Sequence, residues 1–254
     1  MGFFNKLNNL FKDIGNVSNS NSSTITPSAN YTHNTANIVD TNIALELFDS
    51  QCLGGVTSKK TQQILALCKN REEILLKAIE FCGVNPTDAK QLYIASHCYV
   101  WLGAKYRTQA IEYLNKYISV GASWSGTPKG IMSYGNYTVN QLDASKASVY
   151  HYLGKAYEGE YDFENAEIAY ANAEKLEPYF ATYSVCIANT YIKRNELPKA
   201  LQYLQGKKQT PYYKNDINDY KLLLGNALSD VLSKIEKGYV YKPRKKKNIV
   251  SASS

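Results

Sequence analysis

The sequence predicts an all-α protein built from stacked helix hairpins and closed at its C-terminal end by a capping helix. The first observation is a set of small and large side chains at fixed spacings between residues 150 and 178. The second is that part of this set returns 34 residues later, as in a repeat protein. The third is composition: 44% hydrophobic residues, with 7 prolines and 15 glycines in 254 residues, are enough for a packed core with few interruptions.

Residues 150–178 fit a helix, a turn and a second helix. Gly154 and Ala166 are small where the two helices of a hairpin must come close, and large side chains fill the space around them. The stretch from Gly159 to Asp162 supplies the turn, and the Asp162 carboxylate is suited to accept hydrogen bonds from the free N–H groups of the next helix. That helix is predicted over about 163–176, and Pro178 closes the unit because proline cannot continue a helix.

This spacing resembles the tetratricopeptide repeat family at all eight of its signature positions. They are Tyr150, Leu153, Gly154, Tyr157, Ala166, Tyr170, Ala173 and Pro178. The resemblance implies a right-handed superhelical solenoid of antiparallel helix pairs, in which these eight residues pack the repeat. Because one repeat cannot bury its apolar face alone, stacked neighbours and an exposed binding surface are expected.

The units on either side follow the pattern less completely. In the following unit the expected apolar or small residues are Ile187, Ala188, Tyr191, Ala200 and Leu204, and Ser184 and Lys207 depart from it. In the preceding unit Cys98, Trp101, Ala110 and Leu114 fit, while His97 stands where leucine is usual. An amphipathic pattern over about 216–237 predicts the capping helix.

The chain is predicted to have four parts. These are an amphipathic helix over 1–16, a flexible Ser/Asn/Thr-rich linker over 17–36, the helical repeat domain over 37–237 with a loop insertion at 121–143, and a basic disordered tail over 238–254. The apolar face of the first helix suits a membrane interface, a groove of this or another protein, or the chain's own solenoid.

The resemblance places a groove on the first helix of each hairpin. Its inner-face positions carry over to Ser148, His151, Tyr152, Lys155 and Glu158, to Thr182, Val185, Cys186, Asn189 and Ile192, and to Leu92, Ala95, Ser96, Tyr99 and Leu102. This mixed, partly aromatic surface suits an extended peptide or an amphipathic helix of a partner. The carboxylate clamp of chaperone-binding members would need more than Lys155 and Asn189, so a chaperone cofactor is not inferred.

The insertion at 121–143 breaks the repeat period. It is rich in glycine, carries Trp124, Tyr134 and Tyr137, and is expected to form a small hairpin in part. Long insertions in repeat proteins map to surface loops. Trp124 is therefore a candidate ligand contact, with anchoring of the loop on the helices beneath as the alternative.

The tail carries most of the chain's excess charge. Five of the 29 basic residues lie after residue 240, where no acidic residue occurs, so the net charge of +7 falls to about +2 without them. A polybasic end together with an amphipathic N-terminal helix suggests peripheral association with an anionic membrane. The nearly neutral body argues against nucleic acid as a partner.

No motif predicts catalysis, a cofactor or a metal. His33, His97 and His151 have no nucleophile or carboxylate at a known catalytic spacing, and there is no Gly-rich phosphate loop. The five cysteines form no C-x2-C pair, and no apolar run would span a bilayer. We therefore expect a cytoplasmic, non-enzymatic scaffold or adaptor that binds a peptide or helix of a partner protein. The alternative is a peripheral membrane scaffold recruited by its two ends.

Overall fold

The computed structural model describes residues 39–52, 57–122, 131–134 and 137–243, which lie in one compact unit over 37–254. The predicted N-terminal helix and linker, Trp124, and the tail beyond Pro243 lie outside these ranges. The α-helices are α2 (Thr41–Cys52), α3 (Lys59–Leu67), α4 (Arg71–Cys82), α5 (Ala89–Leu102), α6 (Arg107–Ser119), α7 (Gln141–Gly159), α8 (Phe163–Leu176), α9 (Ala181–Lys193), α10 (Leu197–Lys207), α11 (Pro211–Lys214) and α12 (Tyr220–Glu236).

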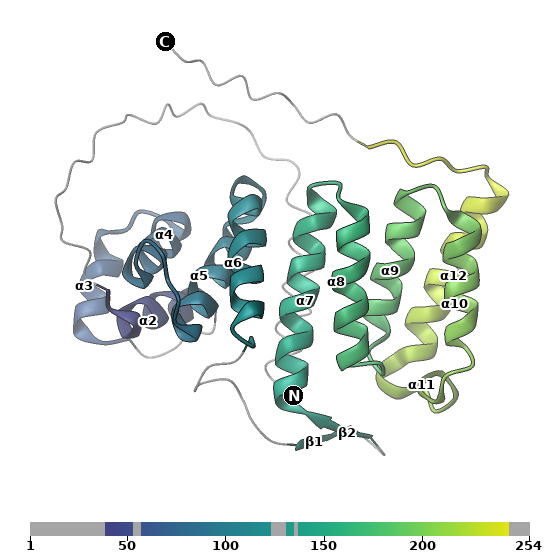
Figure 1. Cartoon of the computed structure of the whole chain (residues 1–254), viewed down its shortest axis with the longest axis horizontal. Helices are drawn as coiled ribbons and strands as arrows, with labels where there is room; N and C mark the ends of the chain where they lie inside the picture. Colours follow the sequence, from purple (N-terminus) through teal and green to yellow (C-terminus); the bar gives the residue numbers. More distant parts are fainter. Residues whose placement is uncertain (1–38, 53–56, 123–130, 135–136, 244–254) are drawn as a thin grey trace, which may run out of the picture. The chain divides into compact units, whose positions relative to one another are not determined.

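The helices stack in chain order as antiparallel pairs (Figure 1). Helix α5 packs on α6, α6 on α7, α7 on α8, α8 on α9, and α9 on α10, while α12 packs on both α9 and α10. The N-terminal helices α2 and α4 pack on each other and on α5. This arrangement confirms the predicted all-α solenoid of helix hairpins, with α12 as its terminal helix.

The predicted boundaries of the central repeat are confirmed. Helix α8 spans the expected residues, and the Asp162 carboxylate accepts a hydrogen bond from the Asn165 N–H at 3.1 Å. Helix α5 begins after Asp88, which caps it in the same way. The capping helix starts at Tyr220, later than expected, because Thr210–Asp219 form the short helix α11 and a 3₁₀ turn.

The insertion contains the hairpin that its sequence suggested. Strands β1 (Ile131–Tyr134) and β2 (Tyr137–Asn140) pair antiparallel, with Ile131 opposite Asn140. The Asn140 side chain then accepts a hydrogen bond from the Leu142 N–H at 2.9 Å and caps α7. The second strand therefore leads directly into the first helix of the central repeat.

The signature residues form the contact between α7 and α8. A Cβ added to Gly154 would lie 2.5 Å from Cε1 of Tyr170, closer than two such carbon atoms can approach. Glycine at this position therefore lets the Tyr170 ring lie directly on the α7 backbone. Of the eight signature residues, Leu153, Gly154, Ala166, Tyr170 and Ala173 are buried, while Tyr150, Tyr157 and Pro178 are half-buried.

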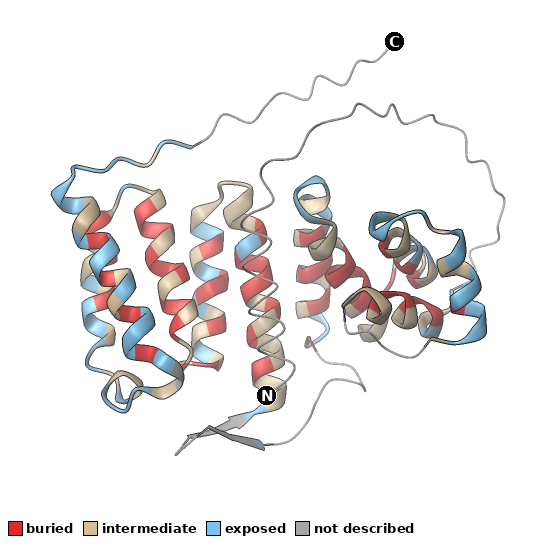
Figure 2. Cartoon of the chain, turned by 180° about the vertical axis from the view of Figure 1, so that it is seen from behind, coloured by how far each residue is buried: buried red, intermediate tan, exposed pale blue. Residues whose placement is uncertain are grey.

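One hydrophobic core joins the last helices that the structure describes. Its buried residues come from α8, α9, α10 and α12 and include Ala166, Tyr170, Ile187, Tyr191, Ala200, Leu204, Tyr220, Leu224 and Leu228. In Figure 2 the buried positions run along each helix and alternate with exposed ones, as in an amphipathic helix that packs on one side. The core residues expected from the second unit are therefore confirmed.

Candidate functional site

The structure divides the predicted groove residues into a buried and an accessible group. His151 and Tyr152 on α7 and Cys186 on α9 are only 8%, 6% and 5% exposed. Because so little of their surface is exposed, these three residues present almost no contact area to a partner. The accessible members include Lys155 on α7, Thr182 and Asn189 on α9, and Tyr99 on α5, of which Lys155 is exposed and the others half-buried.

The buried group nevertheless joins the first helices of three successive pairs. The ring of His97 on α5 lies 5.4 Å from that of Tyr152 on α7, edge to face. The ring of His151 on α7 lies 5.4 Å from that of Tyr183 on α9. Helix α7 therefore contacts both α5 and α9 through aromatic side chains, and the accessible residues lie along this row of helices.

His151 and Cys186 are neighbours but are not a nucleophile and its base. The Cys186 Sγ atom lies 3.7 Å from Nε2 of His151. Burial lowers the pKa of His151 to about 3 and raises the pKa of the Cys186 thiol to about 11. Both groups are thus neutral near pH 7, whereas a nucleophilic cysteine needs a stabilised thiolate. This geometry gives the pair a packing role.

A charged cluster lies at the C-terminal ends of α7 and α9. The Glu158 carboxylate accepts a hydrogen bond from the Tyr170 hydroxyl at 2.5 Å and forms an ion pair with Lys193. The Lys155 ammonium lies 3.9 Å from the same carboxylate. Burial alone would raise the pKa of Glu158, but the two lysines and the tyrosine outweigh it and lower that pKa. Glu158 thus places two cations beside the accessible surface, and sequence reasoning had not singled out Lys193.

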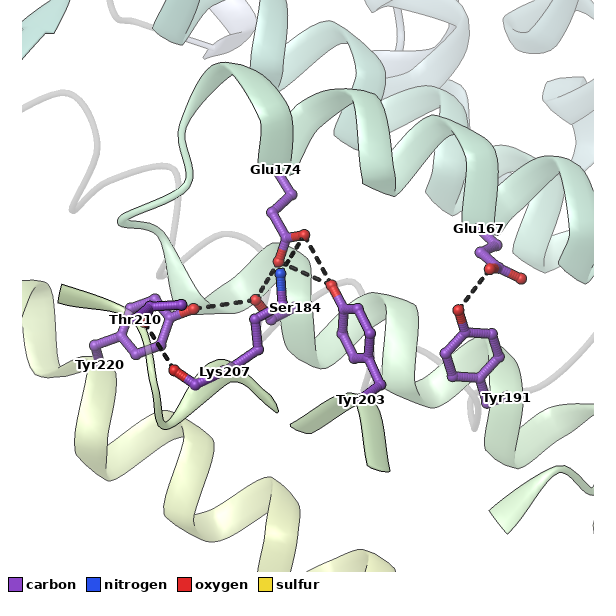
Figure 3. Close-up of polar contacts among 8 residues, drawn as sticks. All are labelled: Glu167, Glu174, Ser184, Tyr191, Tyr203, Lys207, Thr210 and Tyr220. Atoms are coloured by element: carbon purple, nitrogen blue, oxygen red, sulfur yellow. Dashed lines mark hydrogen bonds and ion pairs between the residues drawn. The ribbon is translucent and has the colours of Figure 1, made fainter. Parts of the chain in front are cut away.

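A second polar cluster is centred on Glu174 of α8 (Figure 3). The Tyr203 hydroxyl donates to both carboxylate oxygens at 2.9 and 2.8 Å, and the Lys207 Nζ atom donates at 2.7 Å. Ser184 also donates to Glu174, and its oxygen lies 3.3 Å from the Tyr220 hydroxyl. Glu174 therefore ties α8 to α9, α10 and, through Ser184, α12.

This cluster accounts for both departures from the repeat pattern in the unit that follows residues 150–178. Ser184 and Lys207 stand where an aromatic and a small residue were expected, and both bind Glu174. A serine and a lysine at these positions join Tyr203 in satisfying a half-buried carboxylate. Sequence reasoning missed Glu174, and the paired departures were the available signal.

Replacing Glu174 by alanine is expected to lower the free energy of unfolding by about 2 to 3 kcal/mol, because Ser184, Tyr203 and Lys207 lose their common acceptor. Urea unfolding of the full chain measures this. Glu164→Ala is the matched control, since Glu164 is exposed on the same helix and its loss should change stability by less than about 0.5 kcal/mol. Equal stability of the two variants would contradict the role given to Glu174.

Within the described parts of the chain, no three histidine, cysteine or acidic side chains come together as metal ligands would. The described helices also include none with the length and apolar character needed to cross a bilayer.

The antiparallel helix pairs and the contact between Gly154 and Tyr170 give this chain the fold of a tetratricopeptide-type helical repeat protein. No protein-family model matches the sequence, and no curated protein matches it either.

Among solved structures, the chain is similar to helical repeat proteins at low identity. Two are crystal structures of MamA, at 16% and 17% identity, with TM-scores of 0.41 and 0.44; they cover 72% and 78% of this chain and 98% and 88% of their own. A third is a kinesin light chain with TPR-like repeats from Podosopora anserina, at 12% identity, with a TM-score of 0.42 and coverage of 78% and 97%. All three TM-scores are below 0.5.

Proposed function

We propose that this protein is a non-enzymatic interaction scaffold that binds an extended segment or a helix of a partner protein along α5, α7 and α9. The observation that carries the proposal is the row of first helices, joined by the contacts of His97 with Tyr152 and of His151 with Tyr183. A row of this kind holds residues of successive repeats at regular separations, as recognition of a linear segment requires.

The chemistry of the row suits a peptide better than a small molecule. Asn189 offers an amide that both donates to and accepts from a peptide backbone, and Lys155 offers an exposed cation. Tyr99 adds an aromatic surface, held by the Tyr113 ring at 4.9 Å. Beneath them, the ion pair between Glu158 and Lys193 fixes the ends of α7 and α9 relative to each other. Trp124 remains a candidate contact from sequence alone.

The test uses purified full-length protein and a random peptide library. Peptides selected for binding to the wild type should bind the double variant Lys155→Ala/Asn189→Ala at least about 10-fold more weakly, since each lost polar contact costs about 1 kcal/mol. Fluorescence polarisation measures the affinities. The matched control is Lys175→Ala/Gln202→Ala, which removes a lysine and an amide that are exposed on the second helices α8 and α10.

The proposal would be overturned if the selected peptides bound the two double variants equally well. Urea unfolding should change by less than about 1 kcal/mol in both, because neither pair lies in the core and the contact of Lys155 with Glu158 at 3.9 Å is partly exposed. A peptide that lost affinity for the control variant alone would place the binding surface on the second helices instead.

The alternative of a peripheral membrane scaffold rests on residues 1–16 and on the basic tail, which lie mostly outside the described ranges. It stays a prediction from the sequence. Co-sedimentation of the full chain with anionic vesicles at moderate salt tests it, and loss of binding on deletion of residues 1–16 is the expected result.

A further inference from the structure

The chain reverses direction after its last helix. Gly238 adopts a φ of 58°, in the left-handed region that favours glycine, and its N–H donates to the Ile235 carbonyl at 3.1 Å. The Tyr239 N–H then donates to the Lys234 carbonyl at 2.9 Å. These bonds close the end of α12 and send residues 239–243 back past the turn between α9 and α10 (Figure 1).

The returning segment is held by one side chain of that turn. Asn195, whose φ of 64° is left-handed, accepts a hydrogen bond at Oδ1 from the Tyr241 N–H at 2.6 Å. Its Nδ2 atom lies 3.5 Å from the Tyr241 carbonyl oxygen. One amide side chain thus faces the donor and the acceptor of a single extended residue, which is how an asparagine holds a peptide backbone without reading its sequence.

An aromatic contact favours an aromatic side chain at the position of Tyr241. The Tyr241 ring lies 5.8 Å from the ring of Phe163 at an interplanar angle of 82°, a favourable edge-to-face geometry. Phe163 is the first residue of α8, so this contact connects the end of the chain to the central repeat. The Lys193 ammonium lies 5.8 Å from the centre of the Phe163 ring.

Charge is complementary along the same path. Phe163 is flanked in sequence by Asp162 and Glu164, with Glu160 in the same turn, whereas Tyr241 is followed by Lys242 and then by the basic run of residues 244–247. The contact between Tyr241 and Phe163 therefore brings the residue before Lys242 to a turn with three acidic side chains, of which Glu160 is already paired with Arg107 at 3.3 Å. Attraction of this kind between exposed charges is modest and weakens with salt.

We propose that Asn195 and Phe163 form a docking subsite for an extended segment with an aromatic residue followed by basic residues, and that residues 239–243 occupy it as an internal strap. The strap holds Tyr241, which directly precedes the basic residues of the sequence, beside the acidic turn between α7 and α8. A partner segment of the same chemistry must displace this contact. The proposal is independent of the surface on α5, α7 and α9.

Amide hydrogen exchange measured by NMR on the full chain tests the strap. The Tyr241 amide should exchange about 10-fold faster in Asn195→Gly than in the wild type, because its acceptor is lost. Glycine is chosen since it keeps the left-handed backbone without strain. The Tyr239 amide is the internal control, and its exchange should be unchanged because its acceptor is Lys234. Equal exchange of the Tyr241 amide in the two proteins would overturn the strap.

A second measurement tests the subsite itself. In Tyr241→Ala the strap loses its ring, and a synthetic peptide with the sequence of residues 239–247 should shift the Asn195 side-chain amide resonances at millimolar concentration. The wild type should respond about 2-fold more weakly or less still, because a tethered occupant at a millimolar effective concentration competes with a peptide that binds in the same range. A matched peptide carrying Tyr241→Ala should not shift them. Equal response to the two peptides, or no shift in any protein, would overturn the subsite.

Discussion

Lowering the pH from 7 to 5 is expected to reduce the free energy of unfolding by about 4 kcal/mol, with about 2 kcal/mol from each of two buried histidines. Burial lowers the pKa of His97 to about 4 and that of His151 to about 3. Both side chains are thus neutral in the folded protein at pH 5, while they bind protons in the unfolded chain, where their pKa is about 6.5. The loss begins as pH falls below about 6.5 and grows until the folded-state pKa values are reached.

Two carboxylates, Glu177 and Asp49, act in the opposite direction, since burial raises the pKa of each. Burial raises the pKa of Glu177, which accepts hydrogen bonds from the hydroxyls of Tyr179 and Tyr183, so protonation of this group at mildly acidic pH favours the folded state. Glu158, whose pKa is lowered, adds to the loss only as pH falls below about 4.5, where the unfolded carboxylate takes up protons. The histidines therefore dominate between pH 7 and 5.

Urea unfolding at pH 7 and pH 5 measures this dependence. His97→Leu removes the contribution of His97 and leaves that of His151. Leucine is the usual residue at this position of the repeat. The Tyr93 carbonyl that His97 contacts at 2.8 Å keeps the Ser96 hydroxyl as a donor at 3.0 Å. The difference in stability between pH 7 and 5 should fall to about 2 kcal/mol. A difference as large as in the wild type would contradict a buried, neutral His97.

Replacing Tyr170 by alanine is expected to lower the free energy of unfolding by about 3 to 5 kcal/mol. The ring is fully buried between α7 and the core of α8, α9 and α10, and its removal leaves a cavity. The Glu158 carboxylate also loses the hydroxyl that donates to it at 2.5 Å. Tyr170→Phe separates the two effects and should cost about 1 to 2 kcal/mol, since only the hydroxyl is lost.

The variant Gly154→Ala completes a double-mutant cycle with Tyr170→Ala. In the wild type the new methyl group meets the Tyr170 ring and should destabilise the protein, by about 1 kcal/mol or more. In the Tyr170→Ala background the space is free, and alanine should stabilise the helix by about 0.5 to 1 kcal/mol because it favours helix more than glycine does. The same sign in both backgrounds would mean that Gly154 is not kept small by Tyr170.

The repeat pattern predicted the helices and their core because local periodicity determines both. The spacing of Gly154, Ala166 and Tyr170 indicated which residues touch across a hairpin, and the structure confirms that contact. The start of α12 was placed too early because the turn chemistry of Thr210–Asp219, with two left-handed aspartates, does not appear in a periodicity.

The candidate site was predicted less completely, because family positions say which face a residue lies on and not how deeply it is covered. His151, Tyr152 and Cys186 occupy inner-face positions, yet the rings of Tyr170 and Tyr183 cover this layer. The contacts of Glu174 with Lys207 and of Asn195 with Tyr241 join residues 33 and 46 positions apart. Neither separation belongs to a periodic pattern, so only the folded chain brings these residues together.

The Glu174 cluster also has a consequence for how this protein unfolds. In an ideal repeat array each unit contacts only its immediate neighbours, so the ends open independently of the middle. Here the Glu174 carboxylate on α8 accepts hydrogen bonds from Ser184 on α9 and Tyr203 on α10. Ser184 in turn contacts the Tyr220 hydroxyl on α12. Such longer-range links make the opening of one helix costly for the others. The segment from α8 to α12 should therefore exchange its amide hydrogens as one cooperative block, with no gradual fraying from the C-terminal end.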